Sequence, residues 1–392
     1  MKNKRKNITF GKPDVGTKEI AAIKKVILSK WIGTGAITHK FENKFKNYKK
    51  ANFALAVNSC TAALHLSLIS LGIKKGDEVI TTPMTFSSTI SSIVHTGATP
   101  VLADINPDTF NIDPDSIIKK ITNKTKAIII VHLGGLSCDL DKILKIKKNY
   151  NLFLIEDCAH AVESKYRNKH LGTFGDAGCF SFYSTKNLTT GEGGMILFKD
   201  NKLYNKAKIM SLHGLSKDAW KRKQINENIK NKNENFHYDV KEIGYKYNLT
   251  DLSASMGLVQ LEKLEKNLKK RKLLYDLYCK KLKNLPLKKQ IFNTKKNRHG
   301  CHLFIIVLDK FKTDKNRDDL FKYLTLNKIG CGINYRSVTD MSAFRKYFSW
   351  DDNTCVKSKH MGDNTLSLPL YPTLKSSEVN YICKKIVNFF MD

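Results

Sequence analysis

The feature that most constrains this chain is the regular alternation of strand and helix signals through its first two thirds. Strand signals cover 53–57, 78–82, 99–103, 126–131 and 152–155, and helical signals cover 61–71, 86–95, a segment opened by Asp113-Pro114, and 139–149. The isoleucine-rich run over 126–131 is typical of a strand buried on both faces. This order predicts an α/β fold with a mostly parallel sheet flanked by helices, whose ligands gather at the carboxyl ends of the strands.

The pattern changes near residue 250. Residues 249–284 read as largely helical and end before Pro286; a strand over 303–308 and helices over 318–327 and 376–390 follow. We therefore predict a large domain over 1–250, which begins with an N-terminal arm, and a smaller α+β domain over 251–392.

The charge of the chain is strongly positive, with 68 Lys and Arg against 36 Asp and Glu. The lysines are spread through nearly every helical stretch, and the aromatic residues do not interleave with them as a nucleic-acid stacking platform requires. The distribution therefore favours general compositional bias over nucleic-acid binding, with attraction of an anionic substrate as a further alternative. A Lys/Asn-rich run over 221–235 predicts a solvated loop or insertion.

No apolar run approaches the roughly 20 residues of a membrane-spanning helix. The basic start, Met1 to Lys6, is not followed by an apolar segment, so we expect no signal peptide. Nine cysteines are scattered without a C-x-x-C pair. This pattern predicts reduced thiols in a cytoplasmic protein.

Two carboxylates and an imidazole follow the strand signal at 152–155, namely Glu156, Asp157 and His160. A carboxylate at such a strand end could ligate a metal, act as a general base, or pair with a protonated ring nitrogen. A helix N-cap at a strand–helix turn is the structural alternative.

Lys186 lies between a β-like run and a loop with three glycines, and hydroxyl residues flank it. A lysine kept away from water has its charged form disfavoured, so its amine is available for Schiff-base chemistry. A chance lysine before a glycine-rich turn is the alternative. The 29 residues that separate Asp157 from Lys186 leave room for one helix and one strand, so both side chains could meet at neighbouring strand ends.

Ser59, Cys60 and Thr61 lead from a strand end directly into an amphipathic helix. Free N–H groups at a helix start form a phosphate cradle, although a plain serine N-cap is the alternative. Phe86 follows another strand end, where it could stack on a flat cofactor or simply belong to the core. A phosphate cradle, an aromatic face, an acid for a ring nitrogen and an amine for an aldehyde together describe pyridoxal 5′-phosphate (PLP). We predict no metal site.

Several segments closely resemble the DegT/StrS family of PLP-dependent nucleotide-sugar aminotransferases, among them NSCTAALHLSL, GDEVITTPMTFSST, IEDCAHA, LGTFGDAGCFSFYSTKNLTTGEGGM and GYKYNLTDLSASMGLVQL. They occur in family order from about residue 11 to 261. The resemblance implies the type I fold of aspartate aminotransferase, with PLP bound by the large domain.

The resemblance also implies roles for individual residues. Lys186 would hold PLP covalently and then act as acid and base, Asp157 would keep the pyridine nitrogen protonated, and Phe86 would stack on the ring. The phosphate would be held by Ser59, Cys60, Thr61 and Ser181. The ring oxygen would face His160, a position that is often glutamine in the family. Asn248 would reach the phosphate bound to the neighbouring subunit, in a homodimer with shared sites.

The implied reaction takes an amino group from glutamate or another amino acid, which leaves the cofactor as pyridoxamine 5′-phosphate. That group then passes to a keto carbon of a nucleotide-linked deoxyhexose, for amino-sugar or surface polysaccharide (lipopolysaccharide) biosynthesis. Glu192, Tyr335 and Arg336 are our candidates for substrate contacts. Relatives often carry a His-Tyr-x-Pro-x-His-like stretch, whereas residues 333–339 here lack the proline and both histidines, which leaves the sugar open.

Other functions remain possible at this point. The chain could be a PLP-binding regulatory protein without turnover, against which the Lys186/Asp157 pair argues. A sugar dehydratase of the same family is a second alternative, but a histidine replaces the lysine in those relatives. A nucleic-acid-binding protein on a recycled scaffold is a third, and the dispersed charge argues against it.

Overall fold

A computed structural model of the chain describes residues 7–217, 220 and 238–391. Its strands are β1 (Phe53–Val57), β2 (Glu78–Thr81), β3 (Thr99–Leu102), β4 (Thr125–Val131), β5 (Phe153–Asp157), β6 (Lys165–Tyr166), β7 (Lys169–His170), β8 (Ala177–Ser181), β9 (Gly194–Phe198), β10 (Leu287–Lys288), β11 (Asn297–Arg298), β12 (Phe304–Leu308) and β13 (Thr365–Leu368). Its helices are α1 (Thr17–Leu28), α2 (Ala36–Lys49), α3 (Cys60–Ser70), α4 (Ser87–Val94), α5 (Pro114–Lys120), α6 (Leu140–Asn149), α7 (Asn201–Met210), α9 (Asp251–Lys281), α10 (Arg317–Leu326), α11 (Ser342–Phe348), α12 (Val356–Asn364) and α13 (Ser376–Met391), with short 3₁₀ turns at Leu133–Gly135 and Val338–Asp340.

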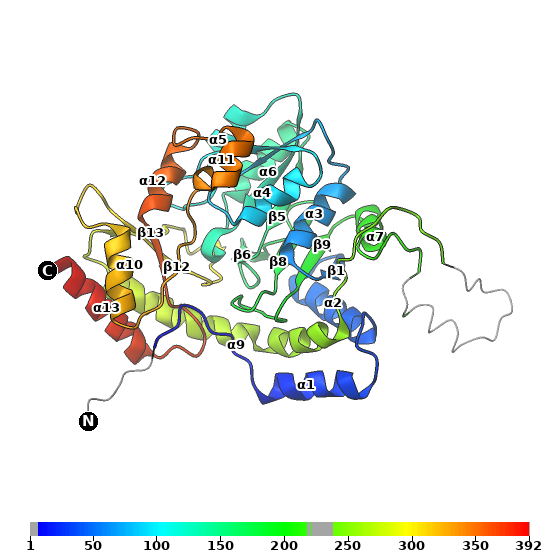
Figure 1. Ribbon diagram of the computed structural model, residues 1–392, viewed down its shortest axis with the longest axis horizontal. Coiled ribbons are helices and arrows are strands. Elements are labelled where there is room, and N and C mark those ends of the chain that lie inside the picture. The colour runs from blue at the N-terminus through cyan, green and yellow to red at the C-terminus, as the bar shows by residue number, and fades with distance from the viewer. Residues whose placement is uncertain (1–6, 218–219, 221–237, 392) are drawn as a thin grey trace.

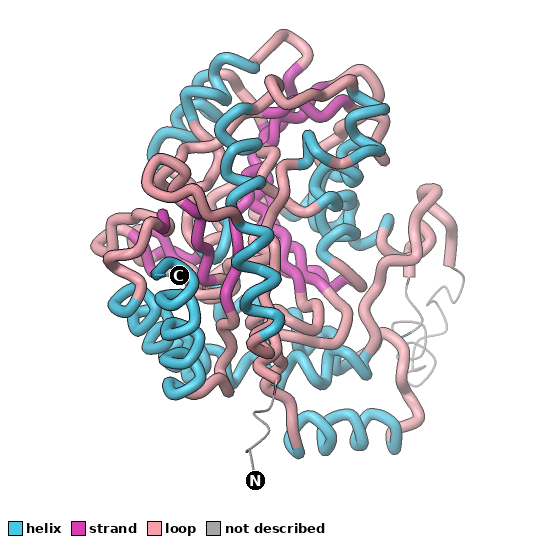
Figure 2. The backbone as a smooth tube through the Cα atoms, turned by 60° about the vertical axis from the view of Figure 1, so that its left-hand side comes forward, coloured by secondary structure: helices cyan, strands magenta, loops and turns pink. Residues whose placement is uncertain are grey.

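The central sheet has seven strands in the order β1-β9-β8-β5-β4-β2-β3 (Figure 1). Only β9 runs against the other six strands, which confirms the mostly parallel sheet. Figure 2 shows these strands in magenta between layers of helix. The predicted elements up to residue 157 are confirmed with shifts of a few residues at their ends.

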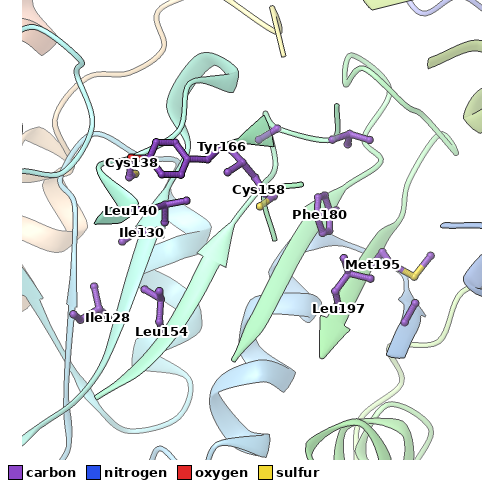
Figure 3. Packing of buried hydrophobic residues seen from close by; sticks show 14 of the residues in the cluster. Ile128, Ile130, Cys138, Leu140, Leu154, Cys158, Tyr166, Phe180, Met195 and Leu197 are labelled. Carbon is purple, nitrogen blue, oxygen red and sulfur yellow. The ribbon is translucent and has the colours of Figure 1, made fainter. Parts of the chain in front are cut away.

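Side chains of the sheet alternate between two apolar layers, because successive residues of a strand point to opposite faces. In β4, Ala127 and Ile129 pack toward α3, α4 and α7, whereas Ile128 and Ile130 pack toward α2, α6 and α9. Figure 3 shows part of the second layer, in which Leu154 and Phe180 continue the surface formed by the β4 isoleucines. Both faces of the sheet are therefore covered.

The separation of Asp157 and Lys186 leaves room for one helix and one strand, and the structure has the strand β8 but no helix there. A short β6–β7 hairpin and a series of turns precede β8 instead. The carboxylate of Glu156 accepts hydrogen bonds from the backbone N–H groups of Gly172, Phe174 and Gly175 at 2.7–2.8 Å. These contacts fold the segment back over the end of β5, where it makes no continuous helix.

The C-terminal third forms a separate apolar cluster around the three-stranded sheet β10-β12-β13, with α10, α13 and the later turns of α9 packed on it. The N-terminal segment joins this cluster, since Ile8 forms a bridge to Ile329. Helix α9 contributes Ala254 and Leu264 to the core under the large sheet and Leu274 to the C-terminal cluster. The division at residue 250 stays a prediction.

The Lys/Asn run at 221–235 and the basic start at 1–6 lie outside the described residues. Among the residues that are described, no helix combines the length and apolar character needed to cross a bilayer.

Candidate active site

The six strands that run in one direction end at the edge of the central sheet where β9 begins, and a cavity of about 480 Å³ lies there. Its wall includes Ser59, Cys60, Thr61, Phe86, Asp157, His160, Ser181, Lys186, Glu192 and Tyr335. The structure therefore brings together every predicted site residue except Asn248 and Arg336.

Ser59 ends the turn after β1 and caps helix α3. Its backbone is extended, and its hydroxyl accepts a hydrogen bond from Ala62 N–H at 3.1 Å. Ser59 is thus an N-cap, as in the structural alternative, but this cap satisfies only one of the free N–H groups at the start of the helix. Among the described residues no acceptor takes the N–H of Cys60 or Thr61. Two free N–H groups and the positive helix end form a site for an anion at the cavity wall.

Asp157 is the last residue of β5, and only 5% of its surface is exposed. Thr89 donates to Oδ2 at 3.0 Å, and the backbone N–H of Ala159 donates to Oδ1 at 3.1 Å. Burial raises the pKa of the carboxyl, whereas these donors and the charge of Lys186 act to lower it. No described cation forms an ion pair with Asp157, so this carboxylate is suited to a cationic ring nitrogen. No helix follows it, which excludes the N-cap alternative.

Lys186 lies in the loop from Phe182 to Gly193 that joins β8 to β9. Its backbone N–H donates to Tyr183 O at 3.0 Å. Burial lowers the pKa of its amine to about 8, although Cys60 and Asp157 oppose this shift. At such a pKa roughly a tenth of the amine is neutral at pH 7, against a negligible fraction for an exposed lysine. Strands β5 and β8 are parallel neighbours, so Asp157 and Lys186 meet as predicted despite the missing helix.

Phe86 stands directly before α4 with 60% of its surface exposed in the cavity wall. This exposure excludes the core alternative for Phe86. Its ring lies 6.2 Å from the ring of Tyr335, measured between centroids, across the cavity wall. An exposed aromatic face beside an anion cradle is the arrangement that a flat phosphorylated ring requires.

His160 and Tyr335 form a hydrogen bond, and the other contact of the His160 ring shows which of the two side chains is the donor. Gly134 N–H donates to His160 Nδ1 at 3.3 Å, so the hydrogen of the neutral ring lies on Nε2 and is donated to the Tyr335 oxygen at 3.1 Å. Burial, followed by the charge of Lys186, lowers the pKa of His160 far below its usual range. Burial raises the pKa of Tyr335, which keeps the phenol protonated. The Tyr335 O–H is thus left to donate toward a ligand.

Ser181, the last residue of β8, accepts only a long hydrogen bond from Tyr183 N–H at 3.4 Å, so its hydroxyl hydrogen is available. Glu192 is exposed at the cavity wall, and its backbone oxygen accepts the Thr190 hydroxyl. The free donors, the buried carboxylate, the exposed ring and the weakly basic amine all line one space. These residues fit PLP, and no residue of the set conflicts with it.

Two predicted residues lie elsewhere. Asn248 donates to the Thr34 hydroxyl at 2.6 Å and lines a different cavity, of about 220 Å³, beside α2 and α7. Arg336 is exposed and forms a surface ion pair with Asp340 at 3.7 Å.

Several residues near the site were missed. Thr89 lies one helical turn after Phe86 and could have been found from that spacing. His302 packs its ring 4.5 Å from that of His160, and no local pattern pointed to it. His132, Glu156 and Cys158 lie close enough together to hold a metal ion. However, the oxygens of Glu156 already accept three backbone N–H groups and His132 Nε2–H, so hydrogen bonds account for this cluster.

Comparisons with known proteins agree with this geometry. The DegT/DnrJ/EryC1/StrS aminotransferase family profile matches residues 13–387. The spore coat polysaccharide biosynthesis protein SpsC of Bacillus subtilis is 39% identical over 380 residues, which cover 97% of this chain and 96% of that protein. The putative sugar aminotransferase Spr1654 of Streptococcus pneumoniae has been solved in PLP and pyridoxamine phosphate forms. Its pyridoxamine phosphate form matches this chain with a TM-score of 0.89 and 32% identity, over 98% of this chain and 99% of that chain.

A further solved structure is PseC of Helicobacter pylori, an aminotransferase involved in the biosynthesis of pseudoaminic acid. It shares 27% identity and a TM-score of 0.87 over 98% of this chain and all of its own. The profile match spans nearly the whole sequence, and the fold is that of the solved aminotransferases. The chain belongs to the DegT/DnrJ/EryC1/StrS aminotransferase family of PLP-dependent sugar aminotransferases.

Proposed function

We propose that this aminotransferase moves an amino group from an amino acid, with glutamate as the donor, to a keto carbon of a nucleotide-linked deoxyhexose. The observation that carries the proposal is that Asp157, at the end of β5, and Lys186, in the loop after the neighbouring strand β8, face the same cavity. The product would be an amino sugar for a surface polysaccharide such as lipopolysaccharide. The names of the relatives that concern spore coat polysaccharide and pseudoaminic acid support this assignment.

The chain's own groups have distinct tasks in this proposal. Bound PLP supplies the electron sink for the carbanion that forms when the substrate carbon loses a proton. Lys186 Nζ holds the cofactor and then moves the proton, for which its neutral form is required. Asp157 stays ionised and keeps the ring nitrogen protonated. Ser59, Cys60, Thr61 and Ser181 hold the phosphate, Phe86 covers the ring face, and His160 lies at the ring oxygen.

Substrate contacts are assigned to the rim of the same cavity. Tyr335 directs a phenol hydrogen toward the space beside Phe86, where it can bind a sugar oxygen. Glu192 stands exposed at the loop after Lys186 and can accept a substrate hydroxyl or amine. Arg336 lies just outside and can meet the substrate's phosphates if its pair with Asp340 opens. The net charge of +32 attracts the anionic sugar nucleotide over longer distances.

A homodimer with shared sites is part of the proposal. Asn248 is turned away from the cavity of its own chain. Helix α1, at the bottom of Figure 1, carries Ile20, Ile27 and Leu28 with more than half of their surfaces exposed. Exposed apolar residues on one helix are typical of an interface. We also place the enzyme in the cytoplasm, because all nine cysteines are free thiols.

The first experiment identifies the covalent link. Borohydride reduction of the PLP-loaded enzyme, followed by peptide mass spectrometry, is expected to place the cofactor on Lys186. Lys186→Ala should keep the wild-type circular dichroism spectrum and lose transamination. Trapping at another residue, or wild-type turnover in the variant, would reject the site.

The second experiment identifies the reaction. The enzyme is incubated with glutamate and a panel of keto-sugar nucleotides, and amino products are identified by mass and NMR. We expect glutamate to remove the yellow absorption of bound PLP and one sugar nucleotide to restore it. A colour that glutamate leaves unchanged would favour the regulatory protein, and loss of a sugar hydroxyl without amine transfer would favour the dehydratase.

A further inference from the structure

The residue that follows Lys186 is held by three hydrogen bonds from two separate parts of the chain. Asn187 Nδ2 donates to the carboxylate of Glu163 at 2.9 Å and to Gly300 O at 3.0 Å, and Asn187 Oδ1 faces His302 Nδ1 at 2.9 Å. Because the two amide hydrogens are already donated, Oδ1 must accept, and His302 Nδ1 must carry the hydrogen. The amide of Asn187 therefore donates both of its hydrogens and accepts one through its oxygen, which fixes its orientation.

Glu163, one of these partners, is fully buried and paired with an equally buried arginine. Arg271 of α9 donates from Nη2 to Glu163 Oε1, and the exposed fractions of the two side chains are 1% and 0%. Among the described residues, Arg271 Nε and Nη1 have no hydrogen-bond partner. The pair thus links helix α9 to the Lys186 loop through Asn187.

A buried ion pair of this kind costs free energy, because both charges are removed from water. A buried ion pair gains little net stability over apolar side chains of similar volume, and unpartnered guanidinium donors add a further penalty. Stability alone therefore does not account for it. What the pair does provide is a fixed carboxylate oxygen at the amide of the residue next to Lys186.

Main-chain hydrogen bonds hold both sides of the Lys186 loop, since Lys186 N–H donates to Tyr183 O and Phe182 N–H donates to Gly193 O. The two sides differ in the side chains of the residues next to the lysine. Before the lysine, Tyr183 and Thr185 are exposed. After it, Asn187 makes its three bonds and Leu188 is fully buried. Of the described residues next to Lys186, only Asn187 thus fixes the backbone through side-chain hydrogen bonds to other segments. His302 extends the same network, because its ring packs on that of His160 in the cavity wall.

We propose that Asn187 is a positioning residue that holds the Lys186 backbone in place for reaction with the cofactor, and that the Glu163–Arg271 pair is retained to orient its amide. The inference rests on the proposed function, since it presumes that Lys186 is the attachment point. It adds that the reactivity of this lysine depends on a hydrogen-bonded anchor that touches neither cofactor nor substrate.

Asn187→Leu tests the anchor, because leucine has a similar volume and no hydrogen-bonding groups. The readouts are the rate at which added PLP attaches to Lys186, followed by the visible absorption band, and kcat and KM for glutamate. We expect attachment at least ten times slower and a comparable fall in kcat, with KM changed less than threefold. A folded variant whose attachment rate and kcat both stay within threefold of wild type would overturn the proposal.

If Asn187→Leu fails to fold, a comparison of two double variants tests the same proposal. Glu163→Gln/Arg271→Met removes both buried charges but retains an amide oxygen that can accept from Asn187, and Glu163→Leu/Arg271→Leu removes the acceptor as well. Both should melt at or near the wild-type temperature. We expect the attachment rate to stay within threefold in the first and to fall at least fivefold in the second. Equal rates in the two double variants would contradict the positioning role.

Two controls separate this inference from the proposed function. Glu265→Gln removes an exposed ion pair with Arg298 from the same helix, and it should leave the attachment rate unchanged. If borohydride fails to trap PLP on Lys186 in the wild-type enzyme, the proposed function is wrong. If trapping succeeds and the anchor variants behave as wild type, only the positioning role is wrong.

Discussion

The proposed role of Asp157 requires an anion at a buried position, where burial raises the pKa of the carboxyl and the donors around it act to lower that pKa. Asn keeps the shape of the side chain and can still accept from Ala159 N–H. It cannot balance a ring cation, so we expect Asp157→Asn to lower kcat by several orders of magnitude. Steady-state kinetics with saturating PLP measures this effect. Asp276→Asn, at an exposed position of α9, is the matched control, and a loss of only a few-fold in Asp157→Asn would reject its role.

The amine of Lys186 gives a prediction about pH. Only the neutral amine attacks an aldehyde, and burial lowers its pKa to about 8. The rate of PLP attachment should therefore rise with pH, and it should level off just above pH 8. Stopped-flow absorbance from pH 6 to 10 measures this profile. A rate that still climbs between pH 9 and 10 would show an amine with the pKa of an exposed lysine.

Tyr335 lines the cavity, and its hydroxyl hydrogen is available to a ligand because His160 Nε2–H donates to its oxygen. Tyr335→Phe removes that donor and keeps the ring. One lost hydrogen bond of about 1 kcal/mol predicts a five- to tenfold higher KM for the sugar nucleotide. KM for glutamate and the PLP attachment rate should change little. Tyr347→Phe, on exposed α11, is the control; an unchanged sugar KM in Tyr335→Phe would place its hydroxyl outside the substrate site.

At the scale of the elements, the strand ends could be predicted and the turn after β5 could not. Apolar runs with clear ends located β1 and β5, and so placed Ser59 and Asp157 at one edge. The fold of residues 158–176 depends on backbone bonds to Glu156, which no local pattern encodes. For the same reason His302 was missed: it reaches the site from a distant segment, and only tertiary packing brings it to His160.

The start of β9 sets how closely the anion cradle approaches the sheet. A Cβ added to Gly194 would lie 2.6 Å from Ser59 O and 2.8 Å from Phe180 O, so no side chain fits there without moving the turn before α3. We expect Gly194→Ala to weaken PLP binding at least tenfold and to lower the free energy of unfolding by about 1–3 kcal/mol. Fluorescence titration with PLP and urea unfolding measure the two effects. Gly33→Ala, where a Cβ meets nothing within 4 Å, is the control.

At the scale of the whole molecule, the cavity is completed by parts of the chain that are remote in sequence. Strand ends of the central sheet supply its floor, and Asn334 and Tyr335 come from the C-terminal third. Phe10 of the N-terminal segment reaches a smaller space of about 60 Å³ on the other side of Lys186. The resemblance identified Tyr335 in advance, whereas periodicity carried no information about it. Local sequence patterns do not predict such contacts between segments that are remote in the sequence.

Asn248 lines a cavity that contains none of the other predicted site residues, so we expect it to serve the active site of a second chain. If it serves the neighbouring subunit, a dimer of one Lys186→Ala chain and one Asn248→Leu chain contains one intact site. Random pairing makes half of the dimers hybrid, so a one-to-one mixture should regain about a quarter of wild-type activity above the separate variants.

Coexpression of the two variants with different affinity tags allows the hybrid dimers to be purified and assayed alone. Each should show about half of the wild-type kcat per dimer, since one site of the two is native. Lys186→Ala paired with a wild-type chain is the control for a dimer with a single active site. Were Asn248 to act within its own chain, the hybrid would hold no intact site, and its activity would stay at the average of the two parent variants.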